Sequence, residues 1–310
     1  GDALTTGGYN VAVGYLALSA EDGNGRNVAI GSAALTALNA GADAYNVGVG
    51  YSVGSQMTTG IENILMGYNA GTSITSGGHH VAIGHEALAT EDVRSGNVAI
   101  GFQALKTQNA DANTYSVAVG YQALTAATIG LRNIAIGGYA AVAIDEGDDN
   151  IAIGHGALNV EDAGNRSVAI GSYSLYSQYR SGSNNNTAVG YNTGKEITRG
   201  QNNTLIGANS GEAIQATDDN TFIGSGAGTL TQATSKSTFV GTNAGNALDY
   251  SGDNLTCLGY NAEPSAVGVD DEITLGDSNI ATLRCQVNTI TLLSDERDKT
   301  DIQDIDYGLD

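Results

Sequence analysis

The chain has little of several residue types: no tryptophan, one proline, two cysteines and twelve Lys and Arg among 310 residues. Cys257 and Cys285 are too few and too far apart for a disulfide framework or a cysteine-based metal site, so we expect buried free thiols. The 33 Asp and Glu bring the formal net charge to −21. Without clustered basic side chains, we expect neither nucleic acid nor an anionic membrane as a partner. No apolar run approaches the length of a membrane span, so no membrane insertion is expected.

Glycine, in contrast, is abundant and regularly placed. A glycine that follows Val, Ile, Leu or Met recurs with spacings of 17, 19, 17 and 17, and this order repeats with a 70-residue period from Gly14 to Gly224. A fixed period of this length is typical of solenoids, in which each repeat packs on its neighbours. Four coils therefore form a 70-residue superunit. The glycines are at positions 14, 31, 50, 67, 84, 101, 120, 137, 154, 171, 190, 207, 224, 241, 259 and 276.

Each of these glycines ends a short stretch with the alternation of a β-strand. Large aliphatic residues lie one and three positions before it, as in Val28 and Ile30, and the residue between them is usually alanine. Because a strand that is apolar on both faces is covered on both sides, we predict that the alanine face packs against a partner. Two further copies of the chain would cover it by symmetry, which predicts an elongated homotrimer. The alternative is a lone solenoid whose alanine column is its inner face.

Two further columns follow from the same alignment. An asparagine lies four positions before most of the glycines, and an aromatic residue or histidine often follows the glycine. Equivalent residues of stacked coils lie about 4.8 Å apart, so we predict an asparagine ladder and a stacked aromatic ladder. His80 falls in the asparagine column and His85 in the aromatic column. The group His79, His80 and His85 is therefore interpreted as part of these ladders rather than as a metal site.

The columns change in the last third of the repeat. Thr replaces one outer aliphatic residue from Thr187 onward, and the alanine column enlarges to Leu205, Phe222 and Phe239. We predict that the packing partner changes there, and that the chains pass beyond about residue 205 into a more intertwined stem. The expected fold is all-β, a parallel β-solenoid or β-roll of about sixteen 17–19-residue coils. We assign 1–262 to the solenoid, 263–293 to a stem or linker and 294–310 to the start of a C-terminal domain.

The Asn-x-Ala-Ile-Gly coils, over roughly residues 9–262, resemble the head repeats of trimeric autotransporter adhesins. Those heads are trimers of left-handed parallel β-rolls, so the resemblance implies a trimer here. The coils of this chain are longer than those of the adhesin heads, so the match is in the strand and not in the loops.

The segment Leu-Leu-Ser-Asp-Glu-Arg-Asp-Lys at 292–299 resembles the opening of the endosialidase-type intramolecular chaperone domain of phage tail spikes and tail fibres. That domain promotes trimer folding and then removes itself. The resemblance implies Ser294 as nucleophile, Lys299 as its base and Ser294–Asp295 as the cleaved bond, with activity only in the full-length protein. A lysine serves as a base once its surroundings lower its pKa. The alternative is that Ser294 is a helix N-cap.

One of the longer coils differs from the others. Tyr173, Tyr176, Tyr179 and Arg180 precede a polar segment at 181–186. Tyr, Arg and Asn are typical of surfaces that contact sugars or proteins, so these four residues are predicted to contact a receptor. Three copies on a trimer would strengthen weak binding by avidity. The alternative is a solvated loop.

Other motifs favour architecture over chemistry. The Glu-Asp pairs at 21–22, 91–92 and 161–162 recur at the 70-residue step. Glycosidases use two carboxylates, but adjacent loop residues rarely aim at one bond, so architecture is favoured over catalysis or loose cation binding. Gly224, Gly226 and Gly228 lack the βαβ context of a nucleotide site. We expect neither a cofactor nor a metal.

The sequence therefore predicts a segment of a phage tail fibre or tail spike, extracellular in the virion. It would contact a host cell-surface glycan or protein and other virion tail proteins, and it would trimerise with the help of a self-cleaving chaperone. No activity on an external substrate is expected. The alternatives are a surface-polysaccharide depolymerase, for which no cleft with paired acids stands out, a bacterial trimeric adhesin head, which leaves 292–310 unexplained, and a purely structural spacer.

Overall fold

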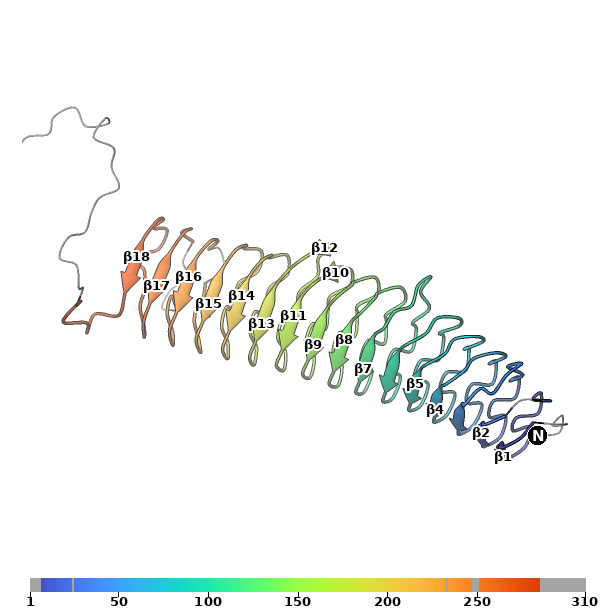
Figure 1. Cartoon of the computed structure of the whole chain (residues 1–310). Helices are drawn as coiled ribbons and strands as arrows, with labels where there is room; N and C mark the ends of the chain where they lie inside the picture. The colour runs from blue at the N-terminus through green and yellow to red at the C-terminus, as the bar shows by residue number, and fades with distance from the viewer. Residues whose placement is uncertain (1–6, 24, 232–233, 247–250, 285–310) are drawn as a thin grey trace, which may run out of the picture. The chain divides into compact units, whose positions relative to one another are not determined.

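The computed structural model describes residues 7–23, 25–231, 234–246 and 251–284. Within them the chain is all-β and winds as a parallel β-solenoid (Figure 1). Sixteen strands of three residues form one parallel sheet in chain order. A separate two-stranded sheet, β10 (Gly164–Asn165) and β12 (Gly182–Ser183), lies in the loops that precede β11 and β13. The solenoid unit extends to Asp277. The sixteen strands are β1 (Val11–Val13), β2 (Val28–Ile30), β3 (Val47–Val49), β4 (Ile64–Met66), β5 (Val81–Ile83), β6 (Val98–Ile100), β7 (Val117–Val119), β8 (Ile134–Ile136), β9 (Ile151–Ile153), β11 (Val168–Ile170), β13 (Thr187–Val189), β14 (Thr204–Ile206), β15 (Thr221–Ile223), β16 (Thr238–Val240), β17 (Thr256–Leu258) and β18 (Ile273–Leu275).

The strands stack in the register that the glycine period predicts. Each residue pairs with its equivalent in the next coil, as Ala82 does with Ala99. The glycine that ends each strand makes a corner that other residues do not adopt. Gly101 has φ +134°, and a Cβ there would lie 2.3 Å from the carbonyl oxygen of Gly120. The predicted coil and its glycine corner are therefore confirmed, with one coil laid directly on the next.

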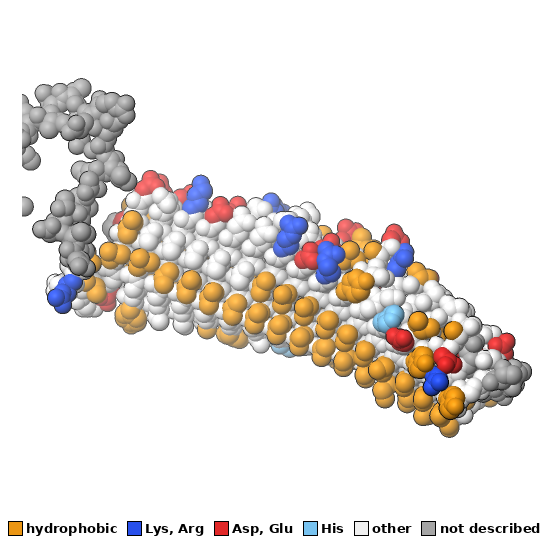
Figure 2. Space-filling view, in the orientation of Figure 1, with side chains coloured by type: hydrophobic (Ala, Val, Ile, Leu, Met, Phe, Trp, Pro, Cys, Tyr) orange, Lys and Arg blue, Asp and Glu red, His pale blue; other side chains and the backbone are white. Residues whose placement is uncertain are grey.

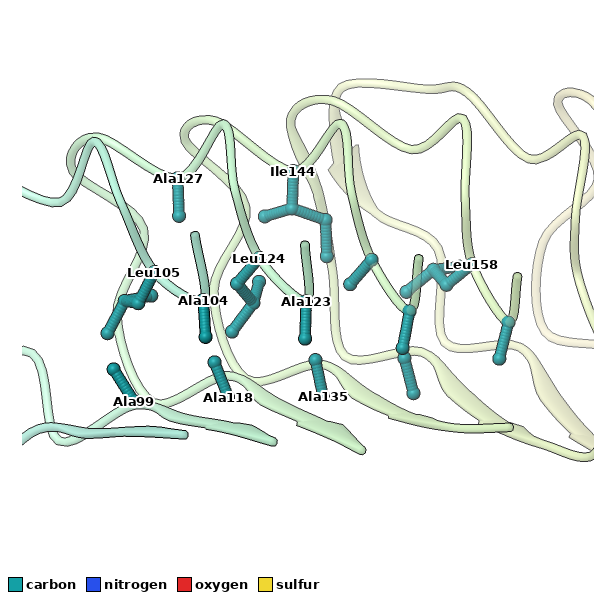
Figure 3. Close-up of a cluster of buried hydrophobic side chains, with 14 of the residues drawn as sticks. Ala99, Ala104, Leu105, Ala118, Ala123, Leu124, Ala127, Ala135, Ile144 and Leu158 are labelled. Atoms are coloured by element: carbon teal, nitrogen blue, oxygen red, sulfur yellow. The ribbon is translucent and has the colours of Figure 1, made fainter. Parts of the chain in front are cut away.

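The alanine column is the inner face of this single chain. Ala99, Ala118 and Ala135 have no exposed surface, and they face the opposite wall of the same coils, where Leu105 and Leu124 lie (Figure 3). The prediction that other copies of the chain cover the alanine face is wrong, and the alternative of an inner face is confirmed. The reason is the narrow coil, because the two walls approach so closely that only a small side chain fits on the strand opposite a leucine.

The enlargement of the alanine column is also an internal event. Phe222 and Phe239 are fully buried, with ring centroids 4.6 Å apart and an interplanar angle of 7°. The facing wall has Gly228 and Gly245 at the position that is Leu105 in an earlier coil, and a Cβ on Gly228 would lie 2.5 Å from Cε2 of Phe222. Ring volume on the strand has thus replaced leucine volume on the opposite wall. The change of packing partner that the two columns predicted is therefore found inside the chain, where glycine replaces leucine on the facing wall. The more intertwined stem beyond about residue 205 stays a prediction.

The outer face of the sheet carries the branched residues instead. Two rows of aliphatic side chains, one and three positions before the glycines, point away from the core and are partly exposed, as with Ile30 at 39% and Ile136 at 40%. We call these two rows the aliphatic stripe. In the row three positions before the glycine, the residues are Thr from β13 to β17. Figure 2 shows hydrophobic side chains following one another along this face, whereas many charged side chains in view lie along the side of the solenoid that carries β10 and β12.

Candidate functional site

The asparagine ladder is confirmed, with a bonding pattern that the sequence did not predict in full. The Oδ1 of Asn63 accepts a hydrogen bond from the backbone N–H of His80 in the next coil (3.0 Å), and its Nδ2 donates to the carbonyl oxygen of Gly77 (3.0 Å). Direct bonds between ladder amides occur as well, for example from Asn203 to Asn186 at 3.1 Å. Most of the buried amides thus close their own coil and bind the next one, whereas the side-chain amide of Asn97 donates to Glu91 instead.

His80 is a member of this ladder. Its Nδ1 accepts from the backbone N–H of Asn97 (3.2 Å), and its Nε2 lies 2.7 Å from the carbonyl oxygen of Arg94, which corresponds to the bond made by Asn63 Nδ2. Burial lowers the pKa of His80 to about 4, so the ring is neutral with its proton on Nε2. His79 instead lies at the surface, 3.2 Å from Glu62. The interpretation of His80 as a ladder residue is therefore confirmed.

The aromatic ladder runs along the outside of the coils. Tyr51 stacks on Tyr68 with centroids 5.4 Å apart, and stacking continues through His85 and Phe102 to Tyr121. The contacts beyond Tyr121 are edge-on. They include Tyr139 and Tyr173, which lie two positions after the glycine and thus one position outside the predicted column. Several of the ladder tyrosines are nevertheless about half exposed, for example Tyr68 at 46% and Tyr121 at 47%. The edge-on members are Tyr139, His155, Tyr173 and Tyr191.

The four predicted receptor residues fall into two places. Tyr173 belongs to the aromatic ladder, and Tyr176 packs edge-on against it at 5.7 Å. Tyr179 and Arg180 instead line a surface pocket of about 340 Å³ beside β10 and β12. We call this the arginine pocket. Its lining residues are Asp162, Ala163, Tyr179, Arg180, Ser181 and Arg199.

The residues of the arginine pocket hold one another in place. Arg180 Nη1 donates to the carbonyl oxygen of Arg199 (3.1 Å). Arg199 Nη2 donates to the hydroxyl of Tyr179 (3.2 Å), and the guanidinium lies 5.5 Å from the centre of the tyrosine ring, in a cation–π contact. The sequence interpretation missed Arg199 and Asp162. Both were within reach, because Arg199 lies one coil period after Arg180 and Asp162 lies one coil period before Tyr179.

A buried carboxylate joins the two loops behind the pocket. Glu161 has no exposed surface. Its Oε1 accepts from the backbone N–H groups of Gly164 (2.8 Å) and Arg180 (3.3 Å), and its Oε2 accepts from the side-chain amides of Gln178 (2.7 Å) and Asn184 (2.8 Å). Charge-assisted bonds of this kind are stronger than neutral ones. Glu161 therefore fixes the loop before the pocket to the loop that carries Arg180.

The Glu-Asp pairs do not present two carboxylates to one substrate. Glu91, like Glu161, is fully buried and accepts bonds from the backbone of its own loop, at Asp92 and Arg94 (both 3.2 Å). Burial raises the pKa of Glu91. The glutamates of these two pairs thus point inward and the aspartates lie nearer the surface, which supports the architectural interpretation. No group of three or more His, Cys, Asp or Glu in the described residues is placed to hold a metal ion.

Several predicted residues lie outside the described part of the chain, namely Ser294, Lys299, the Ser294–Asp295 bond and Cys285. Cys257 is a buried free thiol, as expected, and burial raises its pKa to about 12. None of the described residues forms a helix long and apolar enough to span a membrane. Comparison of the chain with protein-family models, with curated proteins and with solved structures finds no match.

Proposed function

We propose that this chain is a segment of a trimeric phage tail fibre or spike, which attaches the virion to the host surface. The observation that carries the proposal is the aliphatic stripe on the outer face of the sheet. Soluble monomers rarely expose continuous apolar patches of more than a few hundred Å². Here the row one position before the glycine is aliphatic from β1 to β18, and the second row is aliphatic from β1 to β11. An apolar strip along the whole solenoid calls for an equally long partner.

A second and a third copy of the same chain fit that requirement. Identical solenoids that lie side by side match in length and in coil period. A rotation axis parallel to the solenoids would therefore bring the aliphatic stripes of the copies into contact with one another. The resemblance to adhesin heads favours three copies over two. The surface proposed for the trimer is therefore the aliphatic face and not the alanine face. The side of the solenoid with the arginine pocket stays on the outside of the trimer and contacts a host glycan or protein. Other tail proteins join the segment to the virion.

The C-terminal segment supplies the assembly step of this proposal. The motif at 292–299 supports a chaperone domain that brings three chains together and then leaves by cleavage at Ser294–Asp295, with Ser294 and Lys299 in the roles named above. A trimer of solenoids needs such help, because identical repeats can pair in shifted registers that differ by one coil or by one 70-residue superunit.

Light scattering coupled to size-exclusion chromatography tests the trimer. Ile136→Glu places a carboxylate on the aliphatic stripe, and Ile129→Glu is the matched control, because Ile129 is 46% exposed but lies off the sheet. We expect the mass of a trimer for the wild type and for Ile129→Glu, and smaller species for Ile136→Glu. All three chains are expressed as the full-length protein with its C-terminal domain, and a monomeric wild type at micromolar concentration would then refute the proposed assembly. Loss of host-cell binding by the Ile136→Glu variant would in addition connect assembly with attachment.

A further inference from the structure

The arginine pocket is a local exception to the charge of the chain. Most ion pairs in the described residues join exposed or half-exposed groups, among them Arg26 with Asp43 (2.7 Å) and Arg132 with Asp149 (2.6 Å). Arg180 and Arg199 form no ion pair with a carboxylate of the described residues, which is also true of Arg94 and Arg166. Arg180 and Arg199, however, line one pocket together. In a protein with a formal charge of −21, a pocket lined by two arginines and one aspartate, with no ion pair to either arginine, is a candidate site for an external anion.

The two guanidiniums still have most of their donors free to act. Each arginine offers five N–H donors, and the bonds from Arg180 to the backbone of Arg199 and from Arg199 to Tyr179 engage one donor on each. The fork of an arginine matches the two oxygens of a carboxylate. These internal bonds also hold the side chains in position before a ligand arrives, which reduces the entropy lost on binding.

The rest of the pocket suits a sugar. Tyr179 is 44% exposed, and Asp162 and Ser181 lie beside the arginines in the pocket wall. Carboxylate and hydroxyl oxygens accept hydrogen bonds from sugar hydroxyls, which a simple anion lacks. The volume of about 340 Å³ is at the lower end of the range of roughly 300–1,000 Å³ for small-molecule sites.

The repeat supplies an internal comparison. One superunit earlier, Tyr179, Arg180 and Arg199 are replaced at the equivalent places by Asn109, Ala110 and Ile129. In the first superunit the corresponding residues are Asn39, Ala40 and Thr59. The coils are stacked in the same way at all three places. The residues of the arginine pocket are therefore not needed to build the coil, and they distinguish this superunit from the two before it.

We infer that the arginine pocket binds a carboxylated sugar unit of an acidic cell-surface polysaccharide. Arg180 and Arg199 take the carboxylate, Tyr179 contacts the sugar ring, and Asp162 and Ser181 take hydroxyl groups. The inference rests on the proposed attachment function and names the class of receptor. Three pockets on one trimer would raise the avidity for a repeating polymer.

The test is a glycan array followed by titration calorimetry, with the purified wild-type chain and a triple variant, Tyr179→Asn, Arg180→Ala and Arg199→Ile. These three changes copy the residues of the preceding superunit, so circular dichroism and particle mass are expected to stay unchanged. We expect the wild type to bind oligosaccharides that contain uronic or other carboxylated sugars, and to bind the reduced, neutral forms at least about tenfold more weakly. The triple variant loses binding to the acidic forms by a similar factor.

A second variant separates recognition from general attraction. Arg180→Lys with Arg199→Lys keeps both charges but not the planar forks, so we expect affinity between those of the wild type and the triple variant. Equal binding of neutral and acidic glycans, or binding of phosphorylated sugars alone, would overturn the inference. So would wild-type affinity in the triple variant. If the triple variant still attaches to host cells while no acidic glycan binds, the receptor class is wrong and the attachment function stands. A chain that attaches to no host surface refutes the function itself.

Discussion

His80 makes the stability of the solenoid depend on pH, and His80→Asn should remove that dependence. The unfolded chain binds a proton at the ordinary histidine pKa of about 6.5. The folded chain binds it only near pH 4, because burial disfavours the charged ring and lowers its pKa. Since the folded pKa is the lower one, His80 favours folding above pH 6.5, and this contribution is lost as the pH falls from about 6.5 to about 4.

The size of the effect follows from the same values. One pKa unit corresponds to about 1.4 kcal/mol, so the difference between 6.5 and about 4 amounts to about 3 kcal/mol of local stability. Asparagine is the residue at this place in the neighbouring coils, where Asn63 makes the equivalent bonds. We therefore expect His80→Asn to be close to neutral at pH 7, and to be more stable than the wild type by about 2–3 kcal/mol at pH 4.5.

Hydrogen exchange measured by mass spectrometry suits this test, because coils of a solenoid open locally. The amides of β5 and β6 are compared in the wild type and in His80→Asn at pH 7 and pH 4.5. Glu91 also titrates nearby, and its raised pKa strengthens folding at low pH, but it is present in both chains and cancels in the difference. An equal loss of protection in the two chains between these pH values would refute the reasoning.

Three further predictions follow from the core, the buried glutamate and the C-terminal motif. Phe222→Ala should lower the free energy of unfolding by about 3–5 kcal/mol, and Gly228→Leu should also lower it because the leucine clashes with the Phe222 ring. The double variant should recover much of this loss when unfolding is measured in denaturant. Additive losses would contradict the exchange of volume between the two walls. Glu161→Gln should place an N–H group against N–H donors and lower the free energy of unfolding by at least about 2 kcal/mol. Hydrogen exchange in the loops of the arginine pocket should become faster. The matched variant Glu91→Gln should leave exchange at that pocket unchanged. In the full-length protein, mass spectrometry should find the chain cut before Asp295 and Ser294→Ala intact; an intact wild type would rule out self-cleavage.

The sequence was sufficient for whatever is periodic along the solenoid. Strand register, glycine corners, the asparagine ladder and most of the aromatic ladder all repeat at the coil spacing, so counting residues placed them. The direction of the faces did not follow from counting, because strands such as Val98–Ile100 are apolar on both sides and alternation alone does not say which side is inside. The relevant signal was the volume on the facing wall, since Phe222 occurs with Gly228 where other coils pair alanine with leucine.

The arginine pocket was predicted in part for a related reason. Tyr179 and Arg180 stood out as unusual residues in one loop, but Arg199 and Asp162 come from the coils on either side. A site on a solenoid is assembled from residues one coil period apart, not from one continuous segment. Tyr173 and Tyr176 looked similar in sequence, yet the ring of Tyr173 packs edge-on against the ladder ring of His155, and Tyr176 packs against Tyr173.

The orientation of the hydrogen bonds has a mechanical consequence for a solenoid under tension. The strands lie across the solenoid, and the bonds between successive coils, such as the one from Gly101 N–H to the carbonyl oxygen of Ile83 (2.7 Å), run along it. Tension between the two ends loads these bonds coil after coil. Each coil that opens frees about 60 Å of extended chain. A single solenoid pulled along its axis would therefore lengthen in steps of one coil and dissipate mechanical work at each step.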